Sequence, residues 1–122
     1  MELTTFQTRV AQRLSILAVG QVLPADDAEL IQGAYESLVH ELGEHGLSWW
    51  NADEAVPDEF ADPLVGMTAA NLVDDFTIPE PRRTQLIVAG AFGLPQASIA
   101  ERRLRALARA AKVDEPTEID FF

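Results

Sequence analysis

The sequence predicts an all-α protein, a bundle of four to five helices followed by an extended C-terminal tail. Apolar residues recur at intervals of three and four, glycine and proline interrupt that pattern, and no segment alternates long enough to predict a strand. With 122 residues, of which 48% are hydrophobic, one domain can bury a core without disulfides or metals. We expect an up-and-down helical domain over residues 1–113 and a tail over residues 114–122.

The first helix is expected over about residues 5–18. Thr4 and Gln7 have the spacing of a capping box, in which the two side chains bond the free amides at the start of a helix. One apolar face follows at helical spacing and should be buried: Leu3, Phe6, Val10, Leu14 and Leu17. Gly20 and Pro24 then interrupt the chain.

A long second helix is expected from Asp26 to about residue 45. Asp26 and Glu29 form a second cap-like pair, and Gly43 and Gly46 end the helix, since glycine readily adopts the left-handed conformation after a last turn. The inward residues should be Leu30, Ile31, Ala34, Tyr35, Leu38, Val39 and Leu42.

The next two helices are bounded by prolines. The third should begin near Pro57 or at Asp62–Pro63, because proline is best accommodated in a first turn, and Pro79 follows its apolar stripe. That stripe comprises Leu64, Val65, Ala69, Leu72, Val73 and Phe76. The fourth, over about residues 82–92, contains Leu86, Ile87, Val88 and Phe92.

The fifth helix has the clearest start. Ser98 and Glu101 form a capping box, and the helix should continue to about residue 111. Apolar residues are expected inside and arginines largely outside, the latter being Arg102, Arg103, Arg105 and Arg109.

Charge is unevenly distributed along the chain, which has a net charge of −11. Residues 1–81 hold fifteen acids and two bases, residues 82–113 hold seven bases and one acid, and residues 114–122 hold four acids. Such segregation favours self-association or docking between complementary surfaces, although the segments could instead neutralise one another within one bundle. A protein this acidic is a poor candidate for gripping nucleic acid.

The residue inventory argues against an enzyme, a metal or a cofactor. Without cysteine, thiol catalysis and disulfides are excluded. His40 and His45 are five residues apart, about 140° around a helix, so they do not form the two-histidine zinc motif of metallopeptidase helices. Adjacent acids such as Asp26–Asp27 and Asp58–Glu59 fit helix starts better than paired catalytic carboxylates. No stretch approaches the ~18 apolar residues of a membrane span, and we expect a soluble protein made in a cytoplasm.

Three features are candidate binding sites. Arg102 and Arg105 belong to a basic helix whose arginines suit carboxylates of a neighbouring subunit or partner, with nucleic acid as the less favoured alternative. Trp49 and Trp50 could anchor an interface or fill the bundle, and we expect one ring inside and the other exposed.

The tail is the third candidate. Ile119, Phe121 and Phe122 are too few to form a core of their own and alternate with acids. Either they pack back on the bundle, or they insert into a partner by addition to a strand edge or groove.

Several motifs together resemble the phage head-to-tail connector (adaptor) proteins, the tail-accessory-factor family of head completion proteins. They run in order over about residues 5–110. The first is Leu14-x-x-Leu17-Ala-Val-Gly20 followed by Pro24-Ala-Asp-Asp. Next come Leu42-Gly-Glu-His-Gly46-Leu47-Ser-Trp49, the entry Val56-Pro57-Asp58-Glu59, and finally Arg103-Leu104-Arg105 with the closing Asp120-Phe121-Phe122. The sequence departs from the family at Ala18, where glycine is frequent, and at Gly93-Leu-Pro95, which splits a region that is sometimes one helix.

This resemblance implies a structural subunit of a virion or phage-like particle neck, made in a bacterial host. Subunits of this kind form a ring, expected to have twelve members, that binds the portal protein, extends the DNA channel and receives the stopper or tail protein. DNA passes through without specific binding, and an acidic ring would repel its phosphates. In the family the tail commonly reaches the portal, which would place Ile119, Phe121 and Phe122 in that contact.

Two other classes of protein are alternatives to a connector subunit. One is an acidic helical protein-binding regulator, antitoxin or anti-sigma-like, that wraps a basic partner. The other is a small hydrolase of cell-envelope passage that uses carboxylates such as Glu54 or Glu59.

Overall fold

A computed structural model describes residues 1–114 of the chain, with side chains up to residue 111. The described residues form helices and loops without a strand, which confirms the predicted all-α class. The helices are α1 (Leu3–Arg13), α2 (Ala25–Glu44), α3 (Asp58–Asn71), α4 (Arg82–Gly90) and α5 (Ile99–Asp114). Each of them is too short or too polar to cross a lipid bilayer. The tail was predicted to begin at residue 114, but Asp114 is the last residue of α5, and the rest of the predicted tail, residues 115–122, lies outside the described residues.

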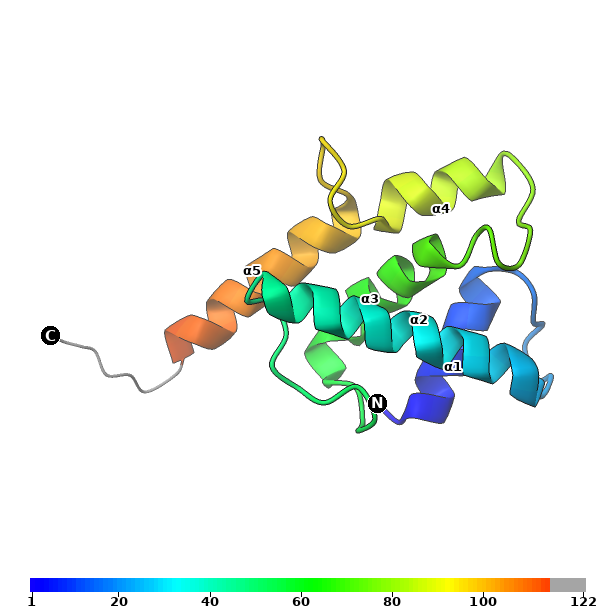
Figure 1. Cartoon of the computed structure of the whole chain (residues 1–122), viewed down its shortest axis with the longest axis horizontal. Coiled ribbons are helices and arrows are strands. Elements are labelled where there is room, and N and C mark those ends of the chain that lie inside the picture. The colour runs from blue at the N-terminus through cyan, green and yellow to red at the C-terminus, as the bar shows by residue number, and fades with distance from the viewer. Residues whose placement is uncertain (115–122) are drawn as a thin grey trace, which may run out of the picture.

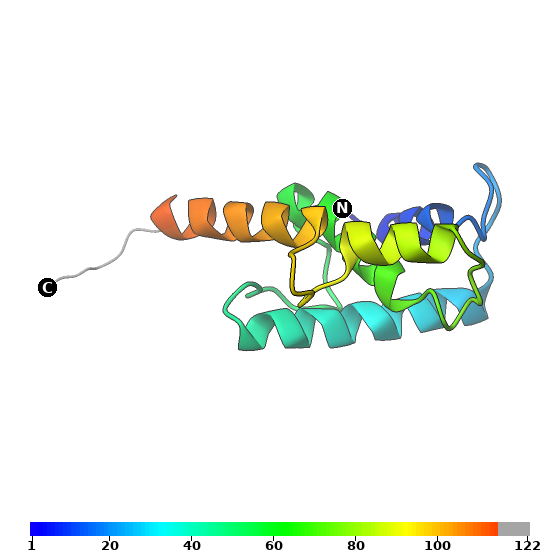
Figure 2. The ribbon, with the colours of Figure 1, turned by 90° about the horizontal axis from the view of Figure 1, so that it is seen from above.

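Helix α3 is the centre of the molecule and packs against each of the other four helices. Seen from above, α2 forms a layer of its own below the rest (Figure 2). Helices α2, α3 and α4 alternate in direction, as an up-and-down bundle requires, but α5 continues in the direction of α4 (Figures 1 and 2). The second half of α5 therefore extends past the other helices.

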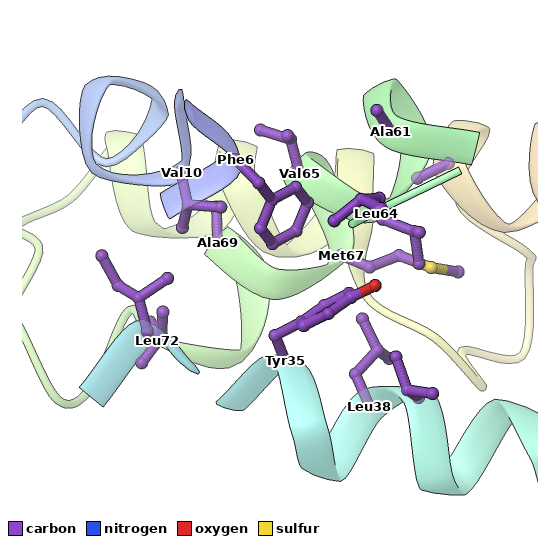
Figure 3. Packing of buried hydrophobic residues seen from close by; sticks show 14 of the residues in the cluster. Phe6, Val10, Tyr35, Leu38, Ala61, Leu64, Val65, Met67, Ala69 and Leu72 are labelled. Carbon is purple, nitrogen blue, oxygen red and sulfur yellow. The ribbon is translucent and has the colours of Figure 1, made fainter. Parts of the chain in front are cut away.

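The central position of α3 follows from its sequence. Its residues from Pro63 to Ala70 are all buried, so it is apolar around its whole circumference and needs neighbours on every side. In Figure 3, Phe6 of α1 and Tyr35 of α2 face one another beside α3, with ring centroids 4.6 Å apart. Such tilted aromatic contacts add to the free energy gained by burying the rings.

The close approach of α4 to α3 depends on Gly90. A Cβ atom built on Gly90 would collide with the carbonyl oxygen of Gly66 and would lie 2.7 Å from its carbonyl carbon. The backbones of the two helices therefore touch at this point. Leu86 of α4 is buried nearby in the same core.

Two predicted helix ends were wrong. α1 stops at Arg13 instead of about residue 18, because Ser15 adopts a left-handed conformation with φ of 63°, which an α-helix does not accommodate. Leu17 is nevertheless buried, so the turn returns the chain to the core. α3 ends at Asn71, and the residues up to Phe76 form turns.

Two of the three capping predictions were also wrong. α1 and α2 begin at Leu3 and Ala25, and in neither does the N-cap residue form a side-chain hydrogen bond. The third was right in part: the Glu101 amide donates to Ser98 Oγ at 3.1 Å, but the Glu101 carboxylate binds elsewhere. Leu30, predicted to point inward, is 47% exposed.

Candidate interaction surface

Part of the arginine-rich region is neutralised inside the molecule. Arg103 of α5 donates to Asp62 of α3 at 2.8 Å, and two arginines of α1, Arg9 and Arg13, lie 3.6 and 3.8 Å from the same carboxylate. Asp62 thus links three helices. The alternative that the charged segments neutralise one another within one bundle is correct for this part of the surface. Half-exposed pairs of this kind contribute about 0–1 kcal/mol each.

Arg105, predicted to bind a partner, is engaged within its own chain. Its Nε donates to Glu101 at 2.9 Å, and its guanidinium carbon lies 5.6 Å from the centroid of the Phe92 ring. Glu101 also accepts a 2.9 Å hydrogen bond from the Gly93 amide. These contacts fasten the loop between α4 and α5 to the first turn of α5. Arg105 therefore already has partners within its own chain, although its side chain is 43% exposed.

The environment of Glu101 lowers its pKa. Burial alone would raise the pKa of this carboxyl group, since only 6% of the residue is exposed. The hydrogen bonds from the Gly93 amide and Arg105 outweigh burial because both stabilise the charged form. The carboxylate is thus held ionised where it ties α5 to the preceding loop.

Arg102 differs from these two arginines. It is exposed, and among residues 1–111 it has no ion-pair partner. It lies instead at the edge of a groove of about 1070 Å³ between α4, the loop at residues 94–98 and the start of α5. We call this the α4–α5 groove. Its apolar lining includes Val88 and Ile99, which are 62% and 59% exposed.

The groove was missed in the sequence, where Val88 was named only as one of the apolar residues of its helix. A signal was present in the run Leu86-Ile87-Val88. Consecutive helical residues are about 100° apart, so three of them cannot all face one core. Leu86 is buried, Ile87 is half-buried and Val88 faces solvent.

The two tryptophans divide as expected, one turned inward and one outward. Trp50, proposed for partner binding, is half-buried, and its indole N–H donates to the Tyr35 hydroxyl at 2.9 Å. Burial raises the pKa of that hydroxyl above its ordinary value, although the hydrogen bond from Trp50 lowers it in part. Trp49 is 59% exposed and packs edge-on against Trp50 and Phe60. The ring available to a partner is that of Trp49.

The histidines and acids do not converge on one point. His40 lies 3.8 Å from Glu44, whereas His45 packs edge-on against Phe92. Within the described part of the chain, no three histidine, aspartate or glutamate residues form a group that could hold a metal ion. Glu54 and Glu59 are exposed.

The apolar tail residues Ile119, Phe121 and Phe122 lie outside the described residues. Of the predicted binding residues that the structure describes, Arg102 lines the α4–α5 groove, and Trp50 lines a smaller open pocket of about 530 Å³ beside Trp49. No protein-family model matches the chain, and no curated protein or solved structure is significantly similar to it.

Proposed function

We propose that this chain is a head-to-tail adaptor subunit of a tailed bacteriophage, or of a phage-derived particle such as a gene transfer agent, and that it has no enzymatic activity. Copies form a ring in the neck of the particle. The ring binds the portal protein, extends the DNA channel and receives the stopper or tail protein. The subunit is made in the cytoplasm of the bacterial host.

The observation that carries this proposal is the separation of two kinds of surface on one small bundle. Residues 1–81 are strongly acidic, whereas α4 and α5 carry most of the bases and the open α4–α5 groove. Different complementary surfaces on one subunit favour heterologous association, which closes into a ring when the rotation between neighbours permits it.

The helix boundaries support the resemblance to connector proteins. The motif that begins at Leu42 and contains Gly46 coincides with the end of α2, and the entry Val56-Pro57-Asp58-Glu59 coincides with the start of α3. The motif Arg103-Leu104-Arg105 lies within α5.

The acidic composition suits a ring through which DNA moves. Phosphates attract bases and release counterions on binding them, so a lumen lined by carboxylates would offer DNA no site to adhere to. We expect no specific DNA binding and a DNA affinity that stays negligible even at low salt.

The test is reconstitution with the portal. The full chain is mixed with a portal ring from the same genome, and the mixture is examined by size exclusion and negative-stain electron microscopy. The expected result is an additional ring on one end of the portal, coaxial with its channel. A chain that remains free beside an intact portal, and instead captures one basic protein as a monomer or dimer, would favour the acidic regulator and refute the adaptor.

A further inference from the structure

The α4–α5 groove is an apolar surface that the described residues leave open. Val88 and Ala89 of α4 lie along it, Leu94 and Pro95 close one end, and Ile99 lies at the start of α5. Val88 and Ile99 are two of the most exposed large apolar side chains outside the loop at residues 14–24. Apolar side chains from two helices that meet in one groove mark a binding site more often than isolated exposed residues do.

The course of α4 and α5 explains why the groove stays open. α4 is held on α3 through Gly90 and Leu86, and α5 is held on α3 through buried residues that include Leu104. Because α5 runs on in the direction of α4, the two helices do not lie flat against each other (Figures 1 and 2). Their apolar flanks are left facing solvent on either side of the loop.

The polar edge of the groove selects an acidic occupant. Arg102 contributes a positive charge that no carboxylate among residues 1–111 neutralises. Glu80 also lines the groove and stays charged, since hydrogen bonds from the Thr84 hydroxyl at 2.7 Å and the Thr84 amide at 3.0 Å lower the pKa of its carboxyl group. The positive charge of Arg83 lies close enough to Glu80 to offset part of that negative charge, whereas Arg102 has no such counter-charge among residues 1–111. A fitting segment therefore combines large apolar side chains with carboxylates.

The chain itself contains such a segment. In residues 118–122, Glu118 and Asp120 alternate with Ile119 and Phe121, and Phe122 follows. In an extended conformation, alternate side chains point to opposite sides, so the apolar groups could enter a groove while the carboxylates stay at its edge. The carboxylates would then meet Arg102.

The length of chain that follows α5 decides whether the groove is filled by the segment of its own chain or by that of another copy. From Ile99 to Asp114 the helix rises by roughly 22 Å, at about 1.5 Å per residue. A segment that doubled back would need that length again, yet the five residues from Asp114 to Ile119 span at most about 18 Å when fully extended. Ile119 cannot reach the level of Ile99 of its own chain, and Phe121, seven residues after Asp114, could extend at most about 25 Å in a straight line, so only the last residues could pass that level. The segment as a whole therefore cannot lie in the groove of its own chain, whereas a neighbouring copy has no such restriction.

We infer that the α4–α5 groove binds residues 118–122 of a second copy of this chain. The contact is heterologous, because groove and tail are different surfaces, so each subunit can bind one neighbour and be bound by another. The inference rests on the proposed function and deepens it by naming the contact between subunits of the ring. It assigns the tail to a neighbouring subunit, whereas the resemblance places the tail on the portal.

The first experiment measures self-association of the full chain without any portal, by light scattering and sedimentation over a range of concentrations. Wild type should form closed oligomers. Val88→Asp, which puts a carboxylate in the groove, and the double variant Phe121→Ser/Phe122→Ser should each be monomeric with an unchanged helical circular dichroism spectrum. Val22→Asp is the matched control. Val22 is 90% exposed but lies between α1 and α2 and does not line the groove, so this variant should assemble like wild type.

Mixing the two defective variants gives the sharper test. One keeps an intact tail and the other an intact groove, so a mixture has one working contact per pair and should stop at the heterodimer. Larger oligomers or two monomers from the mixture would overturn the inference. So would a wild-type chain that is monomeric at every concentration, the result expected if the tail bound its own chain or only a portal.

A synthetic peptide of residues 114–122 tests the site directly. It should bind the tail-defective protein, with affinity reduced roughly tenfold or more by Val88→Asp, because burying an unpaired carboxylate is strongly unfavourable. Arg102→Glu should weaken peptide binding, whereas Arg109→Glu, an exposed arginine of the same helix outside the groove, should have a smaller effect. Equal effects of the two reversals, or none from Val88→Asp, would remove the groove from the contact.

These outcomes are separate from those of the portal experiment. Oligomers that depend on tail and groove but ignore the portal would refute the adaptor and leave the inference intact. If the chain binds the portal as a ring and Val88→Asp binds as well as wild type, the inference about the groove is refuted and the adaptor proposal stands.

Discussion

Helices α1 to α3 bury or half-bury their large apolar side chains, with Leu30 as the exception, whereas α4 and the start of α5 leave Val88 and Ile99 more than half exposed. The charges differ as well, since residues 1–81 are acidic and residues 82–113 are basic. Helices α1 to α3 therefore turn nearly all of their large apolar side chains into the core, which α4 and α5 complete with residues such as Leu86 and Leu104. The α4–α5 region also presents surface that its own fold does not use.

The largest predicted difference between the two regions is in the stability lost when an apolar side chain is truncated. Phe6→Ala removes a fully buried ring that packs on Tyr35, so it should lower the free energy of unfolding by about 3–5 kcal/mol. Val88→Ser in the groove should change it by less than about 0.5 kcal/mol. Urea unfolding followed by circular dichroism measures both. Similar losses at the two sites would show that Val88 is buried in the folded protein and does not line an open groove.

A smaller effect on stability is expected at Gly90, where α4 meets α3, and there alanine should destabilise the helix that it normally favours. Gly90→Ala would normally favour a helix, but its new Cβ would collide with the Gly66 backbone, and overpacking of this kind costs about 1–3 kcal/mol. Gly33→Ala is the control, because a Cβ added there in α2 meets nothing within 4 Å. It should stabilise the protein by up to about 1 kcal/mol. Thermal melts that rise for both variants would mean that α4 is not in backbone contact with α3.

Periodicity predicted all five helices, because each has at least one face with the spacing of an α-helix. It failed where the backbone departs locally from that pattern. Nothing in the apolar series that continues through Leu14 and Leu17 reveals that Ser15 is left-handed. In the same way, Leu30 fits the inward series of α2 but lies at the edge of its buried face. Such details depend on where neighbouring helices stand.

The candidate site was less predictable than the fold. Charge segregation directed attention to α5, but Arg105 and Arg102 have the same residue type and neighbourhood in the sequence. Only tertiary structure pairs the first with Glu101 and leaves the second at the groove. Likewise, the sequence predicted that one tryptophan would be buried, but the choice between Trp49 and Trp50 depends on the position of Tyr35. Long-range partners are not encoded in local spacing.

The smallest predicted effect concerns how the loop between α4 and α5 is held, and it depends on pH. Glu101→Gln keeps an oxygen for the Gly93 amide but loses the negative charge that strengthens this hydrogen bond and the one from Arg105. At neutral pH it should cost about 1 kcal/mol, the difference between a charge-assisted and a neutral hydrogen bond. Glu41→Gln, at an exposed position of α2, is the control and should be nearly neutral.

The direction of the pKa shift of Glu101 determines how this stability difference changes with pH. The pKa of Glu101 is lower in the folded than in the unfolded protein, so its contribution is complete above the ordinary value of 4.5 and is lost as pH falls through the lower folded value. Wild type should therefore exceed Glu101→Gln in stability at pH 7, and the difference should vanish in acid. A constant difference from neutral to acidic pH would mean that the carboxylate is not held by its charge. The loop between α4 and α5 would then be held by the packing of its own Phe92 against His45 and Arg105, and not by the Glu101 hydrogen bonds.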